Sequence, residues 1–349
     1  MNKLLSMVAI LALSSVGVMA AGTDYNVDIT NSAKLTYEVS GVAQNEVTSN
    51  TDTFKVDRKV DVVVATSDTA NIVVVPKINV SSDTKPLTFV VKNSSNGKQD
   101  FVLNVSNLVN GKDTLDSGET DNIDYATDLK ICVDATCSDN KNIAGTNIQF
   151  DEDENKTYYV FANIPDTAED GEHGTIALTA TAVKDGTTTE MTDNKADADV
   201  KNAVDIVFAE AAGVSVGDAQ YDGKHSALSA YEVVTAMIDV SKYSCVIADG
   251  ISADDKWKRI PGATIRYALD VNNTGTAATE GAKLSDTLQN DVTYVANSGV
   301  IKDAACDCTT PAGANTGDTV DVSGQAVTAN FGTVNGNSHE CAYFEVKIN

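Results

Sequence analysis

The side chains that could do chemistry include three histidines, His173, His225 and His339. None of them has a nearby Ser or Cys in a nucleophile-like setting. The segment Gly213–Gly217 loosely matches a nucleophile elbow, but such an elbow needs a strand before it and a helix after it. The residues after Gly217 have loop composition, and no nucleotide-binding or zinc-protease motif occurs. Paired acids could hydrolyse glycosides, but such clefts are lined with aromatics, which are scarce here. The sequence therefore predicts a protein that is not an enzyme.

Two acidic segments could bind calcium, which prefers several oxygen ligands within one loop. The carboxylates of the first segment are Asp113, Asp116, Glu119, Asp121 and Asp124, and those of the second include Asp151 and Asp153. Neither segment has the fixed intervals of an EF-hand, and successive acids in a strand point to opposite faces. Calcium is the cofactor that these residues allow. Solvated acidic turns, with no cofactor, are the alternative that the sequence leaves open.

All six cysteines follow the N-terminal apolar segment: Cys132, Cys137, Cys245, Cys306, Cys308 and Cys341. An even number in an exported chain predicts disulfides. Cys132 and Cys137 are close enough to join a hairpin. One intervening residue would strain a Cys306–Cys308 bridge, so we expect each of these two to pair with one of Cys245 and Cys341. A metal site is a weaker alternative, because no histidine lies at a partnering interval.

The N-terminus has the pattern of an export signal. Lys3 precedes an apolar run over residues 4–18, and Val18 and Ala20 supply the small side chains of a cleavage site. Residues 1–20 are therefore predicted to be a signal peptide cleaved after Ala20. No later stretch approaches the roughly 20 apolar residues of a membrane span. We expect a secreted or cell-surface protein that does not span the membrane after cleavage.

The charge of the chain excludes one class of partner. Fifty acidic residues against 25 basic ones give a net charge of −25. A polyanion of this size repels nucleic acids and anionic lipid headgroups. We therefore expect protein partners or self-association at the cell surface, and no nucleic acid.

The elements that must position these residues are β-strands. Apolar residues alternate with polar ones at Leu35, Tyr37 and Val39, and residues 60–64 form a run expected to be buried. Further alternating segments lie at 87–91, 101–105, 129–133, 158–164, 176–182 and 265–271. Short strands ended by turn residues are typical of β-sandwiches.

The predicted fold class is all-β, with tandem Ig-like antiparallel β-sandwich domains after a cleaved signal peptide. The expected divisions are an N-terminal strand segment over 21–66, a sandwich over 67–202, connecting strands and a loop over 203–240, and a second sandwich over 241–349. The remaining residues are enough for two or three domains.

The C-terminal part resembles the bacterial conserved-repeat family known as domain of unknown function eleven, an Ig-like sandwich of surface proteins. The matching segments are 261–262, 265–271, 273–275, 284–288, 293–295, 331–333 and 344–346. The middle part looks like related sandwiches of secreted bacterial proteins, in its segment 89–93 and in the opening stretch 31–61. The resemblance implies structural or adhesive roles at the cell surface and brings no catalytic residues, and a shared fold does not by itself define a function.

These observations predict a non-catalytic structural or interaction protein, such as a spacer, an adhesin-like protein or a filament-forming envelope component. The strands after Ala21 form no complete domain, so we expect them to be able to pair with a sheet edge of a neighbouring subunit. The alternative is a calcium-stabilised module that binds a small ligand or carbohydrate, with Tyr221, Tyr243 and Trp257 as candidate contacts.

Overall fold

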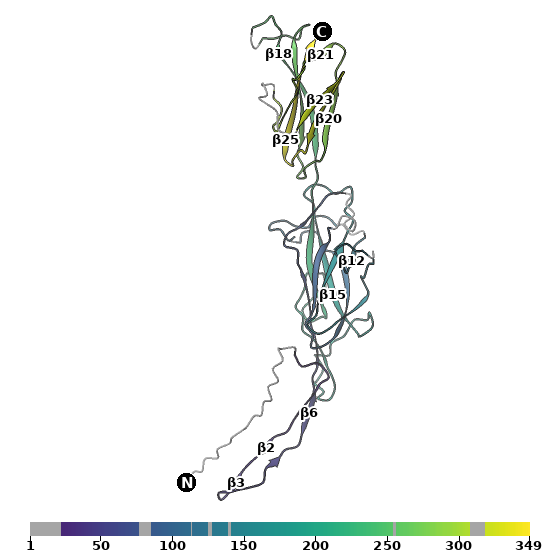
Figure 1. Ribbon diagram of the computed structural model, residues 1–349. Coiled ribbons are helices and arrows are strands. Elements are labelled where there is room, and N and C mark those ends of the chain that lie inside the picture. The colour runs from purple at the N-terminus through teal and green to yellow at the C-terminus, as the bar shows by residue number, and fades with distance from the viewer. Residues whose placement is uncertain are drawn as a thin grey trace.

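The computed structural model is all-β and elongated, with three parts arranged end to end (Figure 1). The structure describes residues 22–76, 85–112, 114–124, 128–138, 141–253, 256–307 and 318–349. The predicted signal peptide, residues 1–20, lies outside the described residues. Within the described ranges there is no helix, and hence none long and apolar enough to cross a membrane. The all-β fold class predicted from the alternating pattern is confirmed.

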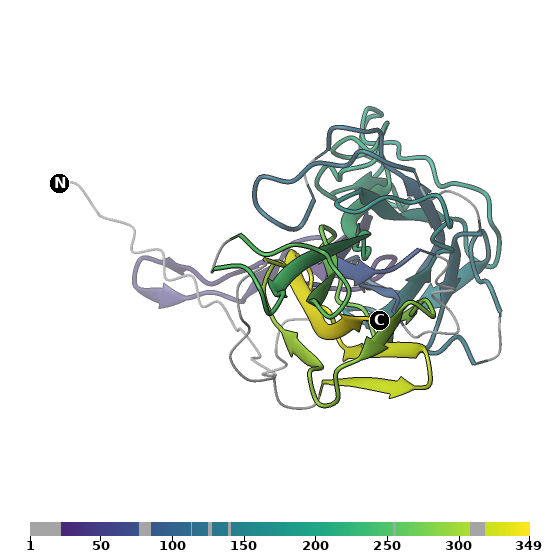
Figure 2. The same cartoon turned by 90° about the horizontal axis from the view of Figure 1, so that it is seen from above.

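The first part is a two-stranded ribbon that projects from the rest of the molecule (Figures 1 and 2). Three antiparallel strand pairs form it, namely β1 (Asp28–Asn31) with β6 (Asp52–Lys55), β2 (Lys34–Leu35) with β5 (Val47–Thr48), and β3 (Glu38–Val39) with β4 (Val42–Ala43). Ser40 and Gly41 make the turn at the tip with φ of 52° and 81°. Positive φ at both central residues matches the right-handed twist of the flanking strands.

The middle part is a sandwich of two sheets. The four-stranded sheet has the order β12-β14-β10-β8, and the five-stranded sheet has the order β13-β11-β15-β17-β9. A small parallel pair, β7 with β16, lies beside them. The strands are β7 (Arg58–Val60), β8 (Val62–Thr66), β9 (Ile72–Val74), β10 (Leu87–Asn93), β11 (Gln99–Asn107), β12 (Lys130–Cys132), β13 (Asn147–Phe150), β14 (Asn155–Phe161), β15 (His173–Val183), β16 (Ile206–Phe208) and β17 (Lys224–Val233).

The core between the two middle sheets is built from alternate residues of their strands. Phe89, Phe101 and Phe150 are fully buried there, and the edge of the Phe150 ring meets Phe101 at 5.4 Å between centroids. The run expected to be buried over residues 60–64 instead alternates, because Val63 is 40% exposed between Val62 and Val64. A strand with one face towards water must alternate in this way.

The middle sandwich is larger than the division predicted from the sequence. Strand β8 lies within the predicted N-terminal segment 21–66, and strand β17 lies within the predicted connection 203–240. Both belong to sheets of this sandwich, since β8 pairs with β10 and β17 pairs with β15. The two sheets also meet at these strands, where the amide of Val64 donates to Nδ1 of His225 at 3.0 Å.

The third part is a second sandwich. One sheet has the order β18-β19-β25-β21, with β22 also paired to β25, and the other has the order β20-β24-β23. The strands are β18 (Ile238–Ala248), β19 (Thr264–Asn273), β20 (Ala282–Thr287), β21 (Val292–Tyr294), β22 (Val300–Lys302), β23 (Thr319–Ser323), β24 (Ala326–Gly332) and β25 (Ser338–Ile348). Phe331 and Phe344 fill the core between the sheets.

Asp170 joins the two sandwiches where β17 leads into β18. Its carboxylate accepts hydrogen bonds from the Thr235 amide at 2.6 Å and from the Thr276 hydroxyl at 2.6 Å. Burial opposes ionisation of Asp170, but these hydrogen bonds outweigh it and hold its pKa below the ordinary value. Because Thr276 belongs to the C-terminal sandwich, the junction is fixed by charge-assisted hydrogen bonds.

Candidate functional site

The ribbon exposes apolar side chains that the sandwiches would bury. Leu35 and Val47 lie opposite each other and are 53% and 51% exposed, and Val39 lies opposite Val42 with exposures of 55% and 63%. Tyr37, between these pairs, is also exposed. Among the described residues the ribbon has only two strands, and no second layer covers these groups. Contiguous exposed apolar residues of this kind mark surfaces that bind a partner.

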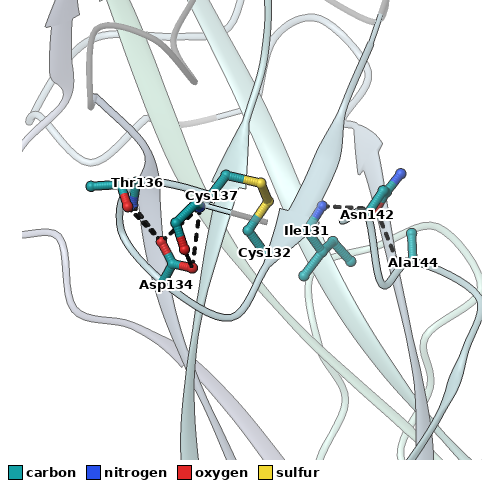
Figure 3. The surroundings of a disulfide bond; sticks show 8 residues. Ile131, Cys132, Asp134, Thr136, Cys137, Asn142 and Ala144 are labelled. Carbon is teal, nitrogen blue, oxygen red and sulfur yellow. Dashed lines mark hydrogen bonds between the residues drawn. A yellow bond between two sulfur atoms is a disulfide. The ribbon is translucent and has the colours of Figure 1, made fainter. Parts of the chain in front are cut away.

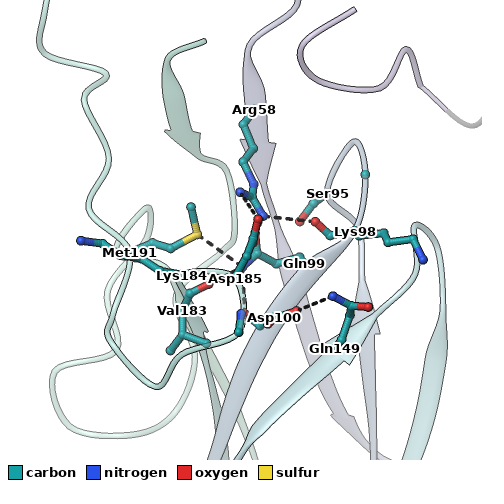
Figure 4. A network of polar contacts seen from close by, with 12 residues as sticks. Arg58, Ser95, Lys98, Gln99, Asp100, Gln149, Val183, Lys184, Asp185 and Met191 are labelled. Atoms are coloured by element: carbon teal, nitrogen blue, oxygen red, sulfur yellow. Dashed lines mark hydrogen bonds and ion pairs between the residues drawn. The ribbon is translucent and has the colours of Figure 1, made fainter.

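The base of the ribbon is anchored by Arg58 in β7 (Figure 4). Its guanidinium donates to Asp185 Oδ1 at 2.8 Å and to the carbonyl of Lys98 at 3.2 Å. It also lies 4.7 Å from the ring centroid of Tyr25, just before the first ribbon strand. Tyr25 in turn packs on Gly97, where an added Cβ would lie 2.8 Å from the ring. The ribbon is thus held to the middle sandwich at its base, while its tip extends into solvent.

Asp100 organises the polar residues next to this anchor (Figure 4). The carboxylate is 2% exposed and accepts hydrogen bonds from the Gly186 amide at 2.7 Å, Asn147 Nδ2 at 2.9 Å and Gln149 Nε2 at 3.2 Å. Burial opposes its ionisation, but these donors and the charge of Arg58 hold its pKa below the ordinary value. The ribbon therefore projects from a base in which the buried acid is fully hydrogen-bonded.

A second exposed surface is strand β18 of the C-terminal sandwich. It is an edge strand that pairs with β19 on one side and, among the described residues, with no strand on the other. Its exposed apolar residues include Ile238 and Val240, and Met237 precedes it with 54% exposure. An edge strand offers unpaired backbone N–H and C=O groups to another strand.

The carboxylates of the first predicted calcium segment have several partners, and Asn71 donates to both Asp116 and Glu119. Asp116 Oδ2 accepts from the Asn71 amide at 2.9 Å, and Asp121 is 2% exposed, with its pKa raised by burial to about 6. Glu119 lies 2.9 Å from Nε2 of His173, and these two come together with Glu232. Asp124 is exposed, and Asp113 lies outside the described residues. Among the described carboxylates of this segment, only Glu119 belongs to a group of three side chains that could hold a metal ion.

The acids of the second predicted calcium segment face lysines. Asp151 lies 2.7 Å from Lys98 Nζ, and Asp153 lies 3.8 Å from Lys92 Nζ. Both acids are exposed, and they point to two different cations. The carboxylates of Asp151 and Asp153 thus each lie close to a lysine of the chain itself.

The cysteines form disulfides in both sandwiches. Cys132 is bonded to Cys137, and Cys306 is bonded to Cys341. Cys245 is also disulfide-bonded, and Cys308 lies outside the described residues. Between Cys132 and Cys137, Asp134 accepts hydrogen bonds from Thr136 and Ser138 (Figure 3). These bonds lower the pKa of Asp134 to about 2.

The histidines and Ser215 have other partners. His225 accepts from the Val64 amide, His339 faces Asp270 at 3.5 Å, and the Ser215 hydroxyl pairs with that of Thr179 at 2.9 Å. Ser215 lies in the loop between β16 and β17, without the strand and helix of a nucleophile elbow. None of these described contacts joins a histidine to a serine or cysteine.

The candidate aromatic contacts lie in two different sandwiches. Tyr221 belongs to the middle sandwich, where Lys195 Nζ lies 5.2 Å from its ring centroid. Tyr243 lies in β18, and Trp257 follows that strand and is half-buried. Tyr221 therefore lies in a different part of the molecule from Tyr243 and Trp257.

Sequence reasoning missed the residues that fix the ribbon and the groups that long-range pairing brings together. Arg58 and Asp185 are distant in the chain, as are Glu119, His173 and Glu232. No local motif marks either group, because both depend on which strands become neighbours. The exception is the ribbon itself, whose alternation and lack of a complete domain are visible in the sequence.

Comparisons with known proteins leave the family open. No protein-family model matches the chain, and no curated protein matches it. Solved structures that it resembles include a Porphyromonas gingivalis protein of unknown function, at 10% identity and a TM-score of 0.20, covering 81% of this chain and 83% of that one. Another is a Corynebacterium diphtheriae protein provisionally described as membrane-anchored, at 12% identity and a TM-score of 0.20, covering 92% and 89%. A third is Escherichia coli alpha-2-macroglobulin, at 12% identity and a TM-score of 0.21, covering 94% and 27%.

Proposed function

We propose that the protein is a non-catalytic structural protein of the cell exterior that assembles with itself through its N-terminal ribbon. The observation that carries the proposal is the projecting ribbon, whose apolar pairs, Leu35 with Val47 and Val39 with Val42, are exposed to solvent. The disulfides support an oxidising compartment. The net charge of −25 disfavours nucleic acid and anionic lipid as partners.

A two-stranded ribbon gains stability from a third strand. An isolated hairpin is at best marginally stable in water, and three strands with an apolar face are needed for independent stability. Beyond the base of the ribbon, no further strand of the described part of the chain pairs with either of its edges. A strand added along either edge would satisfy backbone N–H and C=O groups and cover part of the exposed apolar surface.

The partner that fits this surface is strand β18 of a second copy. Strand β18 has eleven residues and exposed apolar side chains at Ile238 and Val240. Among the described residues no strand pairs with its outer edge, although the Ser244 carbonyl accepts a hydrogen bond from Arg259 at 3.0 Å. The ribbon and the C-terminal sandwich lie at opposite ends of the elongated molecule (Figure 1). Contact between two different surfaces at opposite ends is heterologous, and it propagates into an open filament unless the rotation closes a ring.

The test uses the mature chain from residue 21, followed by static light scattering and electron microscopy. We expect the wild type to form filaments and the double variant Val39→Glu/Val42→Glu to stay monomeric, because two charges then occupy the ribbon tip. The matched control is Val216→Glu, which alters a valine that is 84% exposed in a loop of the middle sandwich. Filaments are expected to persist in the control.

A mixing experiment sharpens the assignment of the partner strand. The variant Ile238→Glu/Val240→Glu alters β18 and leaves the ribbon intact. Alone it should be monomeric, whereas mixing it with the ribbon variant should give dimers, because one intact contact remains possible. A monomeric wild type at every concentration, or filaments that persist in the ribbon variant, would exclude the proposal.

A further inference from the structure

Three carboxylates gather at one end of the C-terminal sandwich. Asp303, Asp318 and Glu340 each offer an oxygen, and these oxygens lie within 4.8 Å of one another. Asp303 follows β22, Asp318 precedes β23, and Glu340 lies in β25. The group therefore comes from three separate segments and has no counterpart in the acidic loops that the sequence singles out.

The strand pairing explains why these acids meet. In the β22–β25 register Lys302 lies opposite Cys341, so the next residues, Asp303 and Glu340, become neighbours. The Cys306–Cys341 disulfide ties the segment after β22 to β25.

Asp318 reaches the group from the other sheet. Its neighbour Thr319 pairs with Asn330, and Asp318 Oδ1 lies 3.9 Å from the position that a Cβ on Gly332 would occupy. The three acids thus bridge both sheets of the sandwich.

Glu340 is the member that most needs a ligand. It is 6% exposed, and its Oε2 atom is buried without a hydrogen-bond partner. Burial, together with the negative charges of Asp303 and Asp318, raises the pKa of Glu340 to about 7. A buried carboxylate beside two other acids is unfavourable unless a cation or a proton neutralises it.

The surroundings of Glu340 suit a hard cation. The three acids line a hollow of about 630 Å³, together with Thr333, Asn335, Asn337, Ser338 and His339. This volume exceeds that of an ion, so water can complete the coordination shell. Calcium takes six to eight oxygen ligands at about 2.3–2.6 Å, and two ligands on opposite sides of the ion are then roughly 4.6–5.2 Å apart. Oxygen separations of up to 4.8 Å fit this range.

We propose that Asp303, Asp318 and Glu340 bind one calcium ion that joins the two sheets of the C-terminal sandwich. The ion replaces the mutual repulsion of the three acids by attraction and gives the buried oxygen of Glu340 a partner. Calcium then stabilises the sandwich that carries β18, independently of whether the chain assembles.

The first measurement is isothermal titration calorimetry of the mature chain with calcium chloride, at protein concentrations below those at which filaments form. The wild type should bind calcium, and Glu340→Gln and Asp318→Asn should each lose one site or bind at that site at least tenfold more weakly. Glu280→Gln, which changes an exposed acid of the same sandwich, serves as the matched control and should bind like the wild type. Binding that is absent in the wild type, or unchanged in both site variants, would refute the proposal.

Thermal unfolding distinguishes a role of Glu340 as a calcium ligand from a purely structural role. In EDTA, Glu340→Gln should unfold at the same temperature as the wild type or higher, because it removes a repelling charge. With calcium, the wild type should gain thermal stability and the variant should gain less. A variant that is less stable than the wild type in EDTA, with an equal gain from calcium, would show that Glu340 only supports packing. The ribbon variants should keep calcium binding, so failure of self-association and failure of this site are distinguishable.

Discussion

The two sandwiches shift the pKa of a buried carboxyl group in opposite directions. In the middle sandwich Asp100 accepts hydrogen bonds from Gly186, Asn147 and Gln149, and its pKa is lowered although it is buried. In the C-terminal sandwich Glu340 is similarly buried but faces two other acids, and its pKa is raised to about 7. The fold alone does not decide whether a buried carboxylate is charged. Whether the carboxylate is charged depends on the hydrogen-bond donors that adjacent segments supply.

The largest loss of stability in either sandwich is expected when a disulfide is removed. The Cys306–Cys341 bridge spans 35 residues of sequence and the Cys132–Cys137 bridge spans 5. By loop-closure entropy, removing the first with alanines should lower the free energy of unfolding by about 4 kcal/mol, and removing the second by about 2 kcal/mol. Urea unfolding measures both, and fluorescence of Trp257, the single tryptophan, reports the C-terminal sandwich. Equal losses would contradict the entropic argument.

Asp100→Ala should have the next largest effect. It leaves several buried donors without an acceptor, so we expect the middle sandwich to lose about 3 kcal/mol in urea unfolding followed by circular dichroism. Asp153→Ala, at an exposed acid with a φ of 56°, is the control and should cost only about 1 kcal/mol, because alanine adopts this φ less readily than aspartate. The pKa of Asp100 is lower in the folded protein than its ordinary value of 3.8. Its contribution to stability should therefore be present above pH 3.8 and be lost as the pH falls through the pKa of the folded state. If Asp153→Ala loses as much stability as Asp100→Ala, the hydrogen bonds of the buried Asp100 carboxylate do not account for the effect.

Glu340 should show the opposite dependence on pH. Its folded pKa is raised from 4.5 to about 7, so its contribution to stability should be present below pH 4.5 and lost as the pH rises through 7. In EDTA, the wild-type melting temperature should therefore fall between pH 5 and pH 8 by more than that of Glu340→Gln. Identical pH profiles of the two proteins would show that Glu340 does not titrate in this range.

The smallest effect on stability is expected from Asp170→Asn. The amide keeps one acceptor oxygen but loses the charge that Thr235 and Thr276 bind, so the cost should be below about 1 kcal/mol. The sandwiches should instead move more freely, which small-angle X-ray scattering would detect as a broader range of interdomain distances. Scattering identical to that of the wild type would mean that other contacts fix the junction.

The sequence predicted the strands better than their assignment to domains. The alternation at Leu87, Phe89 and Val91 matches β10, whose three apolar residues are fully buried. The same period of two occurs at Leu35 and Val39, which remain exposed. Alternation shows that one side of a strand is apolar, but it does not show whether a second sheet covers that side. For the same reason β8 and β17 could not be assigned to the middle sandwich from the sequence.

The candidate site was less predictable than the fold. A local density of acids indicated calcium at residues 113–124 and 151–154, but Asp151 faces Lys98 in the turn before β11 and Asp153 faces Lys92 in β10. Asp303, Asp318 and Glu340 are far apart in the sequence and become neighbours only through strand register and a disulfide. Spacing along the chain does not contain that information.

The path of the chain through the middle sandwich has a mechanical consequence. The chain enters at the ribbon end through β7 and β8 and leaves at the opposite end through β17 (Figure 1). A pull along the long axis would therefore load the β8–β10 and β17–β15 pairs along the direction of their strands. Many hydrogen bonds would then have to break together and not one after another, so a fibre of such units would resist stretching.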